Sequence, residues 1–521
     1  MKRFLSVFLS FVLAFVSVPF VSAANAEDGV SGDFTYTADG GKVTITGYNG
    51  SVGEVVIPAE IEGLPVTAIG AAAFSMENIF KVTMPDSITN IGDSAFSYAG
   101  LTEIMLSENL ITIGEYAFSS CNIIEVTIPD KVTDVGYAAF YNCKNLRKVI
   151  LGSSMKSLKR GLFSYCVSLT DITLPIGVTN IEIFAFDRCT SLTEINVDTA
   201  NTKYSSSGGV LFDKNMTKLI LHPTANARTA YVIPDSVTGI ENDAFNGCKK
   251  LTQITVPDTV TSIGANAFTY CESLTDITIP YRVTNIGNEA FFGCMALTGI
   301  NVDSGNTAYS SIDGVLFNKN ITKLVRYPIG NARTEYMIPE SVTVIGYEAF
   351  YDCINLTEIK ISGGVTVLEN FAFSYCGITE IKLPDGVTSI GDSTFSGCEG
   401  LSEVLIPNSV RTIGKRAFMA CSLQAVTIPK SVTSIGQLAF MLNDNLTIYG
   451  YSGSAAETYA DENNVPFISL DGNGIIISVK EYLLGIKTLT QGETAVFDIN
   501  GDEKVDFADL ALMKRMVGNN L

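Results

Sequence analysis

The residues with the most specific chemistry lie near the C-terminal end of the chain. Side-chain oxygens stand at loop positions 1, 3, 5, 9 and 12, and position 7 would add a backbone carbonyl: Asp498, Asn500, Asp502, Asp506, Asp509 and Lys504. Flexible loops with this spacing surround Ca²⁺ with about six to eight hard oxygens. The sequence therefore predicts one calcium site formed by these six residues.

The residues around this loop predict the element that positions it. The spacing is that of an EF-hand, with Val505 as the apolar eighth residue. Leu510, Met513 and Val517 then share one face of a predicted exiting helix. Glu503 replaces the usual glycine at position 6, and position 12 is aspartate where glutamate is usual. A solvated acidic turn is the alternative, and the ligand spacing with the amphipathic helix favours calcium.

This segment resembles a type I dockerin, a calcium-dependent module that docks onto cohesins. Residues 498–518 match its loop–helix repeat, and residues 479–485 resemble the helix of the preceding repeat. The resemblance implies a small α-helical, EF-hand-like module over residues 471–521, with Ca²⁺ as cofactor. In the first loop, Asp471 and Asn473 are not followed by the expected acids, so one calcium site is expected instead of two.

The same resemblance implies a partner, the cohesin domain of a scaffoldin in a cellulosome-like complex engaged in polysaccharide catabolism. By that resemblance, four residues flanking the loop and helix are candidate cohesin contacts: Phe507, Ala508, Lys514 and Arg515.

Charge and histidine content exclude several function classes. The 521 residues carry 54 acidic and 34 basic side chains, so no electrostatic binding of nucleic acid or of an anionic membrane is expected. His222 is the only histidine, which excludes zinc sites built from several histidines. Any Ser-His-Asp or Cys-His system would depend on that residue, whereas carboxylate-only glycoside hydrolysis is not excluded.

The N-terminus has the pattern of a secretory signal peptide. Lys2 and Arg3 precede an uncharged, mostly apolar run to about Val21, and Ala-Asn-Ala at 24–26 is a cleavage signal. We therefore expect residues 1–26 to be removed and the protein to be extracellular, or held at the cell surface by a cohesin-bearing scaffold. A membrane anchor is the alternative, because the run is nearly long enough to span a bilayer. No later segment comes close to a membrane span.

A repeat of 22 or 23 residues organises most of the chain. Residues 251–273 (LTQITVPDTVTSIGANAFTYCES) show one clean unit. A marker phenylalanine defines 14 units: Phe74, Phe96, Phe118, Phe140, Phe163, Phe186, Phe245, Phe268, Phe291, Phe350, Phe373, Phe395, Phe418 and Phe440. Two spacings are 59 residues instead, and each is one unit plus 36 inserted residues.

Each unit predicts one short strand followed by a return turn. The pattern L-T-x-I-x-I alternates apolar residues, and proline ends the strand. Since no unit can bury its Val, Ile and Phe alone, neighbouring units must stack into a solenoid. Glycine follows the Ile or Val of the turn in ten units, where a tight surface turn is expected. The other four units carry Lys159, Glu182, Glu241 and Glu369.

The two long spacings predict β-hairpin insertions near residues 198–230 and 303–335. Residues 209–223 (GVLFDKNMTKLILHP) match residues 314–328 (GVLFNKNITKLVRYP) at an offset of 105 residues, with two apolar runs around a polar turn. The same offset relates neighbouring units, which indicates duplication of a block of repeats. Because the insertions break the regular surface, they are the best candidates for a specific site in the array.

These units resemble the bacterial BspA-type leucine-rich repeats over residues 66–450. The resemblance implies a mainly β fold, a leucine-rich-repeat solenoid with β-hairpin insertions, that serves as an extracellular and often adhesive scaffold. Residues 32–48 look like the hairpin that opens such proteins, in an expected β cap over residues 27–65. A helix at 452–464 is expected within a C-terminal cap and linker over residues 451–470.

The cysteines recur three residues after a marker phenylalanine: Cys121, Cys143, Cys166, Cys189, Cys248, Cys271, Cys294, Cys353, Cys376, Cys398 and Cys421. Glu77, Ala99 and Asn443 take this position in the other three units. Parallel side chains about 5 Å apart and an odd cysteine number disfavour disulfides. We therefore expect buried, reduced thiols. Metal binding, sporadic disulfides and thiol catalysis are the alternatives, and catalysis would also lack a nearby histidine.

The third residue of each strand is expected to point outward and to form a column of mainly acidic residues: Glu103, Glu125, Lys148, Asp171, Glu194, Gln253, Asp276, Gly299, Glu358, Glu380, Glu403 and Ala425. A solvated β-face explains this column. The alternative is a face that binds a basic partner or a cation-bridged glycan.

Together these patterns predict a secreted, non-catalytic binding or adhesion scaffold. Its dockerin would attach it, with calcium, to a cohesin of a cellulosome-like complex, and its repeats would bind an unknown protein or glycan. One alternative is a stand-alone adhesin with a vestigial dockerin. Another is a polysaccharide-degrading enzyme with its site on the solenoid face or an insertion, although no catalytic residue can be assigned.

Overall fold

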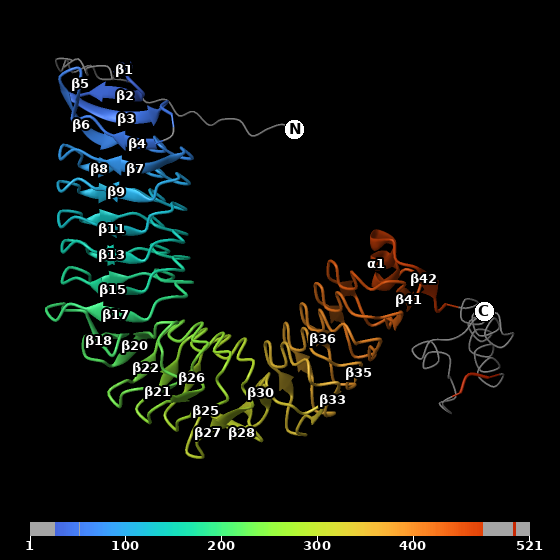
Figure 1. The fold of residues 1–521 in the computed structure, drawn as a ribbon. Coiled ribbons are helices and arrows are strands. Elements are labelled where there is room, and N and C mark those ends of the chain that lie inside the picture. The colour runs from blue at the N-terminus through green and yellow to red at the C-terminus, as the bar shows by residue number, and fades with distance from the viewer. Residues whose placement is uncertain (1–26, 52, 472–503, 507–521) are drawn as a thin grey trace, which may run out of the picture. The chain divides into compact units, whose positions relative to one another are not determined.

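The computed structural model describes residues 27–51, 53–471 and 504–506 (Figure 1). Within these residues the protein is mainly β, a solenoid of short strands with one helix, α1 (Ala455–Asn463), near the end of the described chain. The predicted fold class is thereby confirmed for the repeat region.

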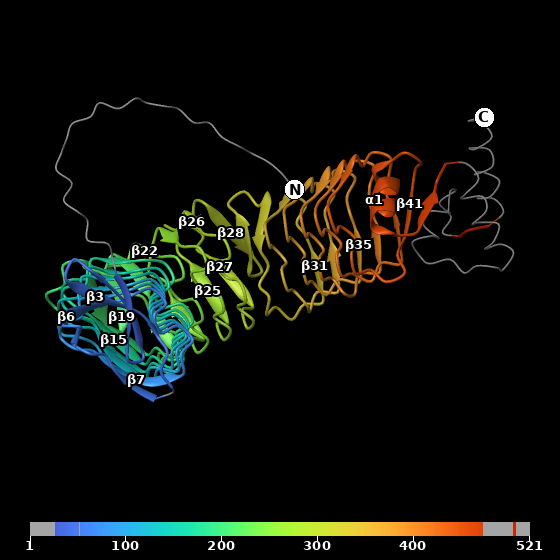
Figure 2. The same cartoon turned by 90° about the horizontal axis from the view of Figure 1, so that it is seen from above.

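Contacts divide the chain into two compact units. The N-terminal unit comprises residues 1–167 and 180–187, and the C-terminal unit comprises residues 168–179 and 188–521. Seen from above, successive turns of the N-terminal unit lie over one another (Figure 2).

Residues 251–273 show how one unit of sequence folds into one turn. The alternating L-T-x-I segment forms β23 (Gln253–Thr255), whose central residue is buried and whose neighbours are exposed. Strands at this position of successive turns line one face of the solenoid, which we call the first sheet, although its hydrogen bonds divide it into several shorter sheets. Strands at the next position of each turn line a second face, which we call the second sheet. After the proline, the chain forms β24 (Ser262–Ile263), a strand of the second sheet. β24 pairs in parallel and in register with β22 (Gly239–Ile240) and β26 (Asn285–Ile286).

The N-terminal unit starts with an antiparallel cap and continues as parallel turns. The cap strands are β1 (Glu27–Ser31), β2 (Phe34–Asp39), β3 (Lys42–Tyr48), β5 (Glu60–Ile61) and β6 (Leu64–Ile69). The first-sheet strands are β4 (Gly53–Val56), β7 (Ile79–Thr83), β9 (Glu103–Met105), β11 (Glu125–Thr127) and β13 (Lys148–Ile150). The second-sheet strands are β8 (Asn90–Ile91), β10 (Thr112–Ile113), β12 (Asp134–Val135), β14 (Ser157–Leu158) and β16 (Asn180–Ile181).

The C-terminal unit repeats this plan around two insertions. Its other first-sheet strands are β15 (Asp171–Leu174), β17 (Glu194–Val197), β21 (Ala230–Val232), β25 (Asp276–Ile279), β27 (Gly299–Val302), β31 (Glu335–Met337), β33 (Glu358–Lys360), β35 (Glu380–Lys382), β37 (Glu403–Leu405), β39 (Ala425–Thr427), β41 (Thr447–Gly450) and β42 (Phe467–Ser469). Its other second-sheet strands are β32 (Val344–Ile345), β34 (Val367–Leu368), β36 (Ser389–Ile390), β38 (Thr412–Ile413) and β40 (Ser434–Ile435).

The marker phenylalanines form a stacked column in the core of each unit. From Phe74 to Phe186, successive ring centroids lie 5.0–6.1 Å apart with rings within 20° of parallel. From Phe350 to Phe440 the spacing is 5.1–5.3 Å. Because each ring covers the next, a turn buries its apolar residues only with its neighbours, as expected of a repeat array.

The turns that carry the insertions keep this column with different side chains. His222 stacks on Phe245 at 5.3 Å, and Tyr327 stacks on Phe350 at 5.4 Å. Both rings stand 23 residues before the phenylalanine they cover. Each long spacing therefore contains one additional turn without a marker phenylalanine, which the count of 14 units from the sequence did not include.

The recurring glycine is explained by close contact between turns. A Cβ atom on Gly114 would lie 2.5 Å from the backbone nitrogen of Asp93 in the preceding turn, and the glycine's own φ is not positive. Left-handed backbone occurs instead two residues on either side of the marker, as at Tyr116 (φ 53°) and Ser120 (φ 58°) around Phe118. The structure thus adds a steric reason for glycine to the tight turn expected there.

All eleven cysteines are buried thiols, which confirms the predicted core ladder. A typical thiol donates to the carbonyl of the marker phenylalanine one turn earlier, as Cys143 does to Phe118 at 3.1 Å. Burial raises the pKa of Cys143 to about 12. Asn443 makes the equivalent bond, because its Nδ2 donates to the carbonyl of Phe418 at 2.8 Å. An amide can therefore replace the thiol as the hydrogen-bond donor at this position.

Helix α1 covers the last ring of the column. Tyr459 packs edge-on against Phe440 at 5.7 Å, and its hydroxyl accepts a hydrogen bond from the backbone nitrogen of Phe440 at 3.0 Å. Asn464 ends the helix in a left-handed conformation. The helix thus closes an edge of the core that would otherwise be exposed.

Candidate functional site

The predicted calcium loop lies almost wholly outside the described residues. The structure shows Lys504 and Asp506 exposed on either side of the buried Val505. The other predicted ligands and the predicted cohesin contacts lie outside the described residues: Asp498, Asn500, Asp502, Asp509, Phe507, Ala508, Lys514 and Arg515. The metal-ligand set and the cohesin contacts therefore stay predictions, as does the signal peptide over residues 1–26.

The predicted acidic column is present on the first sheet of the C-terminal unit. Glu358, Glu380 and Glu403 stand at equivalent positions of β33, β35 and β37, and Lys360 and Lys382 lie two residues farther along β33 and β35. With β39, these strands line a depression of about 890 Å³. The depression thus extends over four successive turns.

The charges in this depression are only partly compensated. Lys360 Nζ pairs with Glu358 at 2.9 Å. Glu380 and Glu403 are direct partners on adjacent strands, and burial together with the charge of Glu380 raises the pKa of Glu403. Neighbouring carboxylates of this kind favour ligands that bring positive charge or hydrogen-bond donors.

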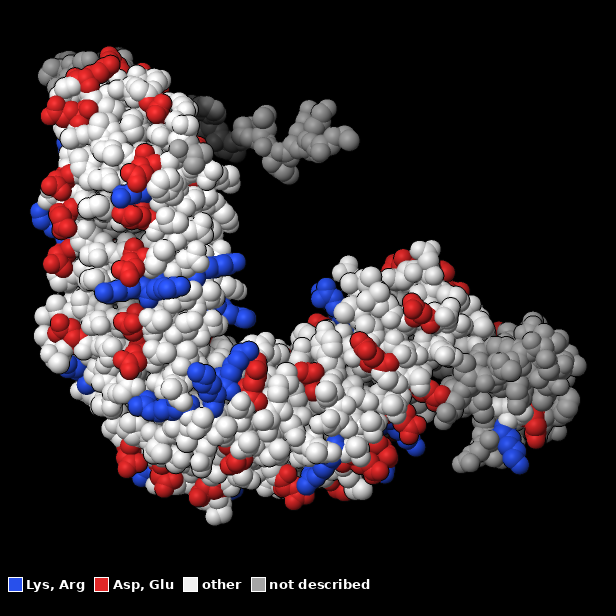
Figure 3. Space-filling model, viewed as in Figure 1, with Lys and Arg blue, Asp and Glu red and all other residues white. Residues whose placement is uncertain are grey.

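Carboxylates also recur from turn to turn on the N-terminal unit (Figure 3). Glu103 pairs with Lys81 at 3.1 Å on the first sheet, and Asp134 pairs with Lys159 at 2.7 Å on the second. Asp134 and Lys159 line a smaller depression of about 410 Å³ with Glu115. These exposed pairs contribute little stability, typically about 0–1 kcal/mol.

His222 lies beside a cysteine, which corrects the expectation that no histidine would be near the thiols. Its Nδ1 is 3.3 Å from Cys248 Sγ, because stacking on Phe245 brings residue 222 next to the cysteine ladder. Burial lowers the pKa of His222 to about 4 and raises that of Cys248. Both groups are neutral near pH 7 and inaccessible to a substrate, so the pair does not form an activated thiolate.

The insertions contain the predicted hairpins. In the first, β19 (Val210–Asp213) pairs antiparallel with β20 (Lys218–Leu221), and in the second β29 (Val315–Asn318) pairs with β30 (Lys323–Arg326). Each hairpin has a further strand that sequence reasoning missed: β18 (Tyr204–Ser207) and β28 (Tyr309–Ile312).

A buried asparagine fixes each insertion to the solenoid. Asn306 Nδ2 donates to the carbonyls of Pro280 and Val283 at 2.7 and 2.9 Å. Its Oδ1 accepts from the backbone nitrogens of Ala308 and Tyr309, both at 2.8 Å. Asn201 makes the same four kinds of bond. The recurrence of N-T-x-Y-S-S at both places is the sequence signal that could have revealed this role.

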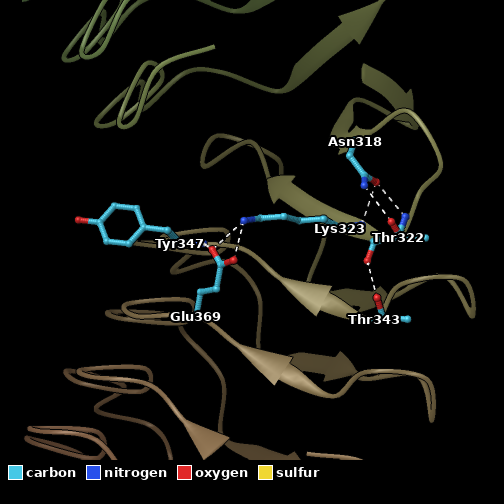
Figure 4. A network of polar contacts seen from close by, with 6 residues as sticks. All are labelled: Asn318, Thr322, Lys323, Thr343, Tyr347 and Glu369. Carbon is cyan, nitrogen blue, oxygen red and sulfur yellow. Dashed lines mark hydrogen bonds and ion pairs between the residues drawn. The ribbon is translucent and has the colours of Figure 1, made fainter. Parts of the chain in front are cut away.

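A lysine on each hairpin pairs with a glutamate that replaces the recurring glycine. Lys218 pairs with Glu241 of the next turn at 2.8 Å. Lys323 reaches Glu369, two turns on, at 2.6 Å, and Glu369 also accepts from the backbone nitrogen of Tyr347 (Figure 4). These glutamates therefore connect the insertions to the following turns.

Comparison with protein families identifies both parts of the chain. The BspA type leucine rich repeat region matches residues 67–193, 111–223, 224–335 and 329–447. The dockerin type I domain matches residues 476–518. No curated protein matches the chain.

Several solved bacterial proteins are similar. A leucine rich cell surface protein from Faecalibacterium prausnitzii is 27% identical, with a TM-score of 0.46, over 83% of this chain and 97% of that one. A leucine-rich repeat protein from Bacteroides ovatus is 25% identical, with a TM-score of 0.38, over 82% of this chain and 100% of that one. One from Eubacterium ventriosum is 25% identical, with a TM-score of 0.41, over 80% and 94%.

Two further observations concern the described residues alone. None of their helices has the length and apolar character needed to cross a bilayer. No group of three or more histidine, cysteine or acidic side chains is placed among them to hold a metal ion.

Proposed function

Because the chain belongs to the BspA-type leucine-rich-repeat family and ends in a type I dockerin, we propose that it is a secreted, non-catalytic binding scaffold. Calcium folds the dockerin, which attaches the protein to a cohesin of a cellulosome-like complex. The repeats then present their surface to a protein or glycan partner.

The observation that carries this proposal is the coexistence of two binding modules in one chain. Dockerins are attachment modules, and the match over residues 476–518 includes the whole predicted calcium loop. The donor set fits Ca²⁺, because all six predicted ligands offer oxygen and none offers nitrogen or sulfur. Bound calcium would hold the acidic side chains of the loop together and so couple ion binding to folding of the module.

A non-catalytic role for the repeats is supported by the state of their reactive groups. The cysteines are buried, burial raises the pKa of Cys143 to about 12, and His222 is buried with a pKa of about 4. The depression on β33, β35, β37 and β39 is instead a surface for contacts. Its glutamates and lysines can hydrogen-bond to a ligand that lies across the strands.

Calorimetry of the full-length protein with a panel of type I cohesins tests the attachment. We expect heat of binding in calcium and none in EDTA. In the double variant Asp498→Ala/Asp502→Ala, affinity should fall at least about a hundredfold, because the loop loses two of its charged ligands. Asp471→Ala, in the degenerate first loop, is the matched control and should bind as the wild type does. An absence of heat in calcium with every cohesin would defeat the docking claim.

A glycan and protein array probed with the calcium-loaded protein tests the scaffold role. Binding should be lost when Glu380 and Glu403 are both changed to Gln, if the depression on the first sheet is the contact surface. Release of new reducing ends from a polysaccharide panel would show that the repeats carry an enzyme instead.

A further inference from the structure

The second insertion interrupts the solenoid with a shortened turn. Leu324 pairs in register with Ile345 of the next turn, and Tyr327 stacks on Phe350. Tyr327 follows Leu324 by three positions in the sequence, whereas Phe350 follows Ile345 by five. The interrupted turn therefore lacks two residues of the ordinary loop. In the next turn, this part of the loop contains the left-handed residue Glu348.

Arg326 lies where this loop is missing. Its Nη1 donates to the backbone carbonyl of Glu348 at 2.6 Å. The side chain is 7% exposed, and its Nη2 has no hydrogen-bond partner among the described residues. A guanidinium buried to this degree is normally paired with a carboxylate. No such ion pair involves Arg326 in the part of the chain that the structure describes.

Three carboxylates lie around the same point. Glu289, before the insertion, and Glu348, after it, both lie near the hydroxyl of Tyr347, and their negative charges help to raise its pKa. Glu348 is 7% exposed, and its Oε2 has no partner among the described residues. Burial and the charge of Glu289 raise the pKa of Glu348, and burial raises that of Asp352. Three carboxylates against one guanidinium leave an excess of partly desolvated negative charge.

Aromatic rings extend from this point along the loops of the neighbouring turns. The ring of Tyr270 is 5.6 Å from that of Phe292, which is 5.0 Å from Tyr351, which is 5.4 Å from Tyr375. Tyr270 and Tyr375 are 37% and 48% exposed. In Figure 4, the exposed ring of Tyr347 points away from the Lys323–Glu369 pair. The carboxylates are therefore bordered by aromatic side chains that a ligand can reach.

The first insertion has the same backbone plan without this group. Its equivalent positions, 105 residues earlier, carry Leu221, Asn242 and Asp243. Leu221 has no charge, and Asp243 accepts a hydrogen bond from Asn246 at 3.0 Å. A shortened turn can thus be built without a buried arginine or an extra glutamate, so the insertion itself does not explain them.

We propose that the second insertion carries a binding site for a lysine side chain of a protein partner, formed by Glu289, Tyr347, Glu348, Tyr351 and Asp352. We call these residues the acidic–aromatic site. The carboxylates complement the ammonium charge, and the tyrosine faces attract organic cations through their quadrupoles. The site rests on the proposed scaffold function and names the chemistry of one partner.

A metal ion fits the site less well than an ammonium group. Among the described residues, no three acidic, histidine or cysteine side chains converge closely enough to hold a metal ion, and aromatic faces contribute nothing to coordination of a hard cation. The rings of Tyr270 and Tyr375 extend the surface beyond the carboxylates. They can contact the residues that flank a lysine in a polypeptide, which a small free amine does not have.

The test uses the full-length protein and a peptide with one central lysine flanked by tyrosine and alanine. Calorimetry or ligand-observed NMR should detect saturable binding to the wild type and none with the acetyl-lysine peptide. The double variant Glu289→Gln/Glu348→Gln should bind at least about tenfold more weakly, because the charge pairing is lost. Asp243→Asn, in the first insertion, is the matched control and should bind as the wild type does.

Spermidine and glucosamine oligomers separate a lysine of a protein from other amines. Tighter binding of either than of the lysine peptide would overturn the assignment. So would equal binding of the acetylated peptide, an unchanged affinity of the double variant, or no binding to the wild type. Calcium-dependent cohesin binding and the urea unfolding transition are measured on the same preparations, because the first reports on the dockerin and the second on folding of the repeats. A failure confined to the peptide then counts against this site and leaves the scaffold function standing.

Discussion

The two insertions share a backbone plan and differ in the side chains of the shortened turn. Each has three antiparallel strands and one buried asparagine that bonds to the preceding turn. In the first, His222 fills the core next to Cys248 as a neutral pair. In the second, Tyr327 fills the core and Arg326 adds a buried charge. Hydrogen bonds to backbone groups therefore determine the structure of each insertion, whereas the side chains of the shortened turn can differ.

The lysine on each hairpin also has a shared position but a different partner in the two insertions. Lys218 pairs with a glutamate one turn away, whereas Lys323 passes Gly346 and pairs with Glu369 two turns away. A Cβ atom on Gly346 would lie 3.0 Å from Lys323 Cε. Glycine in the intermediate turn thus leaves room for the longer reach.

The largest effect is expected from removing the shared asparagines. Asn306→Ala would leave two carbonyls and two backbone N–H groups without partners, so we expect a loss of about 4 kcal/mol in the free energy of unfolding. Asn201→Ala should cost a similar amount, since it removes the same bonds. Urea titration followed by circular dichroism measures both. If only one substitution destabilises the protein, the insertions are not held by a common backbone device.

A smaller effect should distinguish the first insertion through pH. The pKa of His222 is lowered from 6.5 to about 4, so between these values the unfolded chain binds more protons than the folded one. The free energy of unfolding therefore contains the full contribution of neutral His222 above about pH 6.5. This contribution decreases as the pH falls toward 4, by about 3 kcal/mol in total.

The variant His222→Phe should remove this part of the pH dependence, because phenylalanine continues the column without a titrating group. Tyr327→Phe is the control at the second insertion and should leave the same pH range unchanged. Thermal unfolding between pH 4 and pH 7 provides the measurement. Identical pH profiles for wild type and His222→Phe would contradict the assignment.

The smallest effect is expected from the lysine–glutamate pairs. Glu369→Gln should lower the free energy of unfolding by about 1 kcal/mol, because Glu369 also accepts a hydrogen bond from the backbone nitrogen of Tyr347. Glu241→Gln should cost about 0.5 kcal/mol or less, since its pair with Lys218 is more exposed. Urea titrations at low and high salt would compare them. Equal costs would show that the longer reach of Lys323 adds no stability.

Much of the fold could be predicted because its determinants recur. The spacing of the marker phenylalanines and cysteines in the sequence predicts the length of one turn. Stacking of turns follows because a single turn cannot bury its apolar side chains. The outer strands β18 and β28 were missed because Ser-rich segments such as residues 204–207 lack an apolar alternation. The role of Asn306 was missed because its acceptor, the carbonyl of Pro280, lies 26 residues earlier and becomes a neighbour only in the solenoid.

The candidate sites likewise divide into those that could be predicted from local sequence and those that depend on contacts between distant residues. The calcium loop is local, so its six oxygen donors could be predicted from spacing, and that prediction is still to be tested. The acidic column also follows from strand alternation. The acidic–aromatic site could not be predicted, because the burial of Glu348 depends on Arg326 and on a loop that is absent from the interrupted turn. The proximity of His222 and Cys248 depends on the same interruption.

The thiol column gives the protein eleven internal reporters of local opening. Each cysteine is buried, and for Cys143, Cys294 and Cys421 the pKa is raised to about 12, so little thiolate reacts while a turn remains closed. Alkylation at a given cysteine would then measure how often that turn separates from its neighbours. A time course of labelling, read by mass spectrometry, would map where along the column the array opens first.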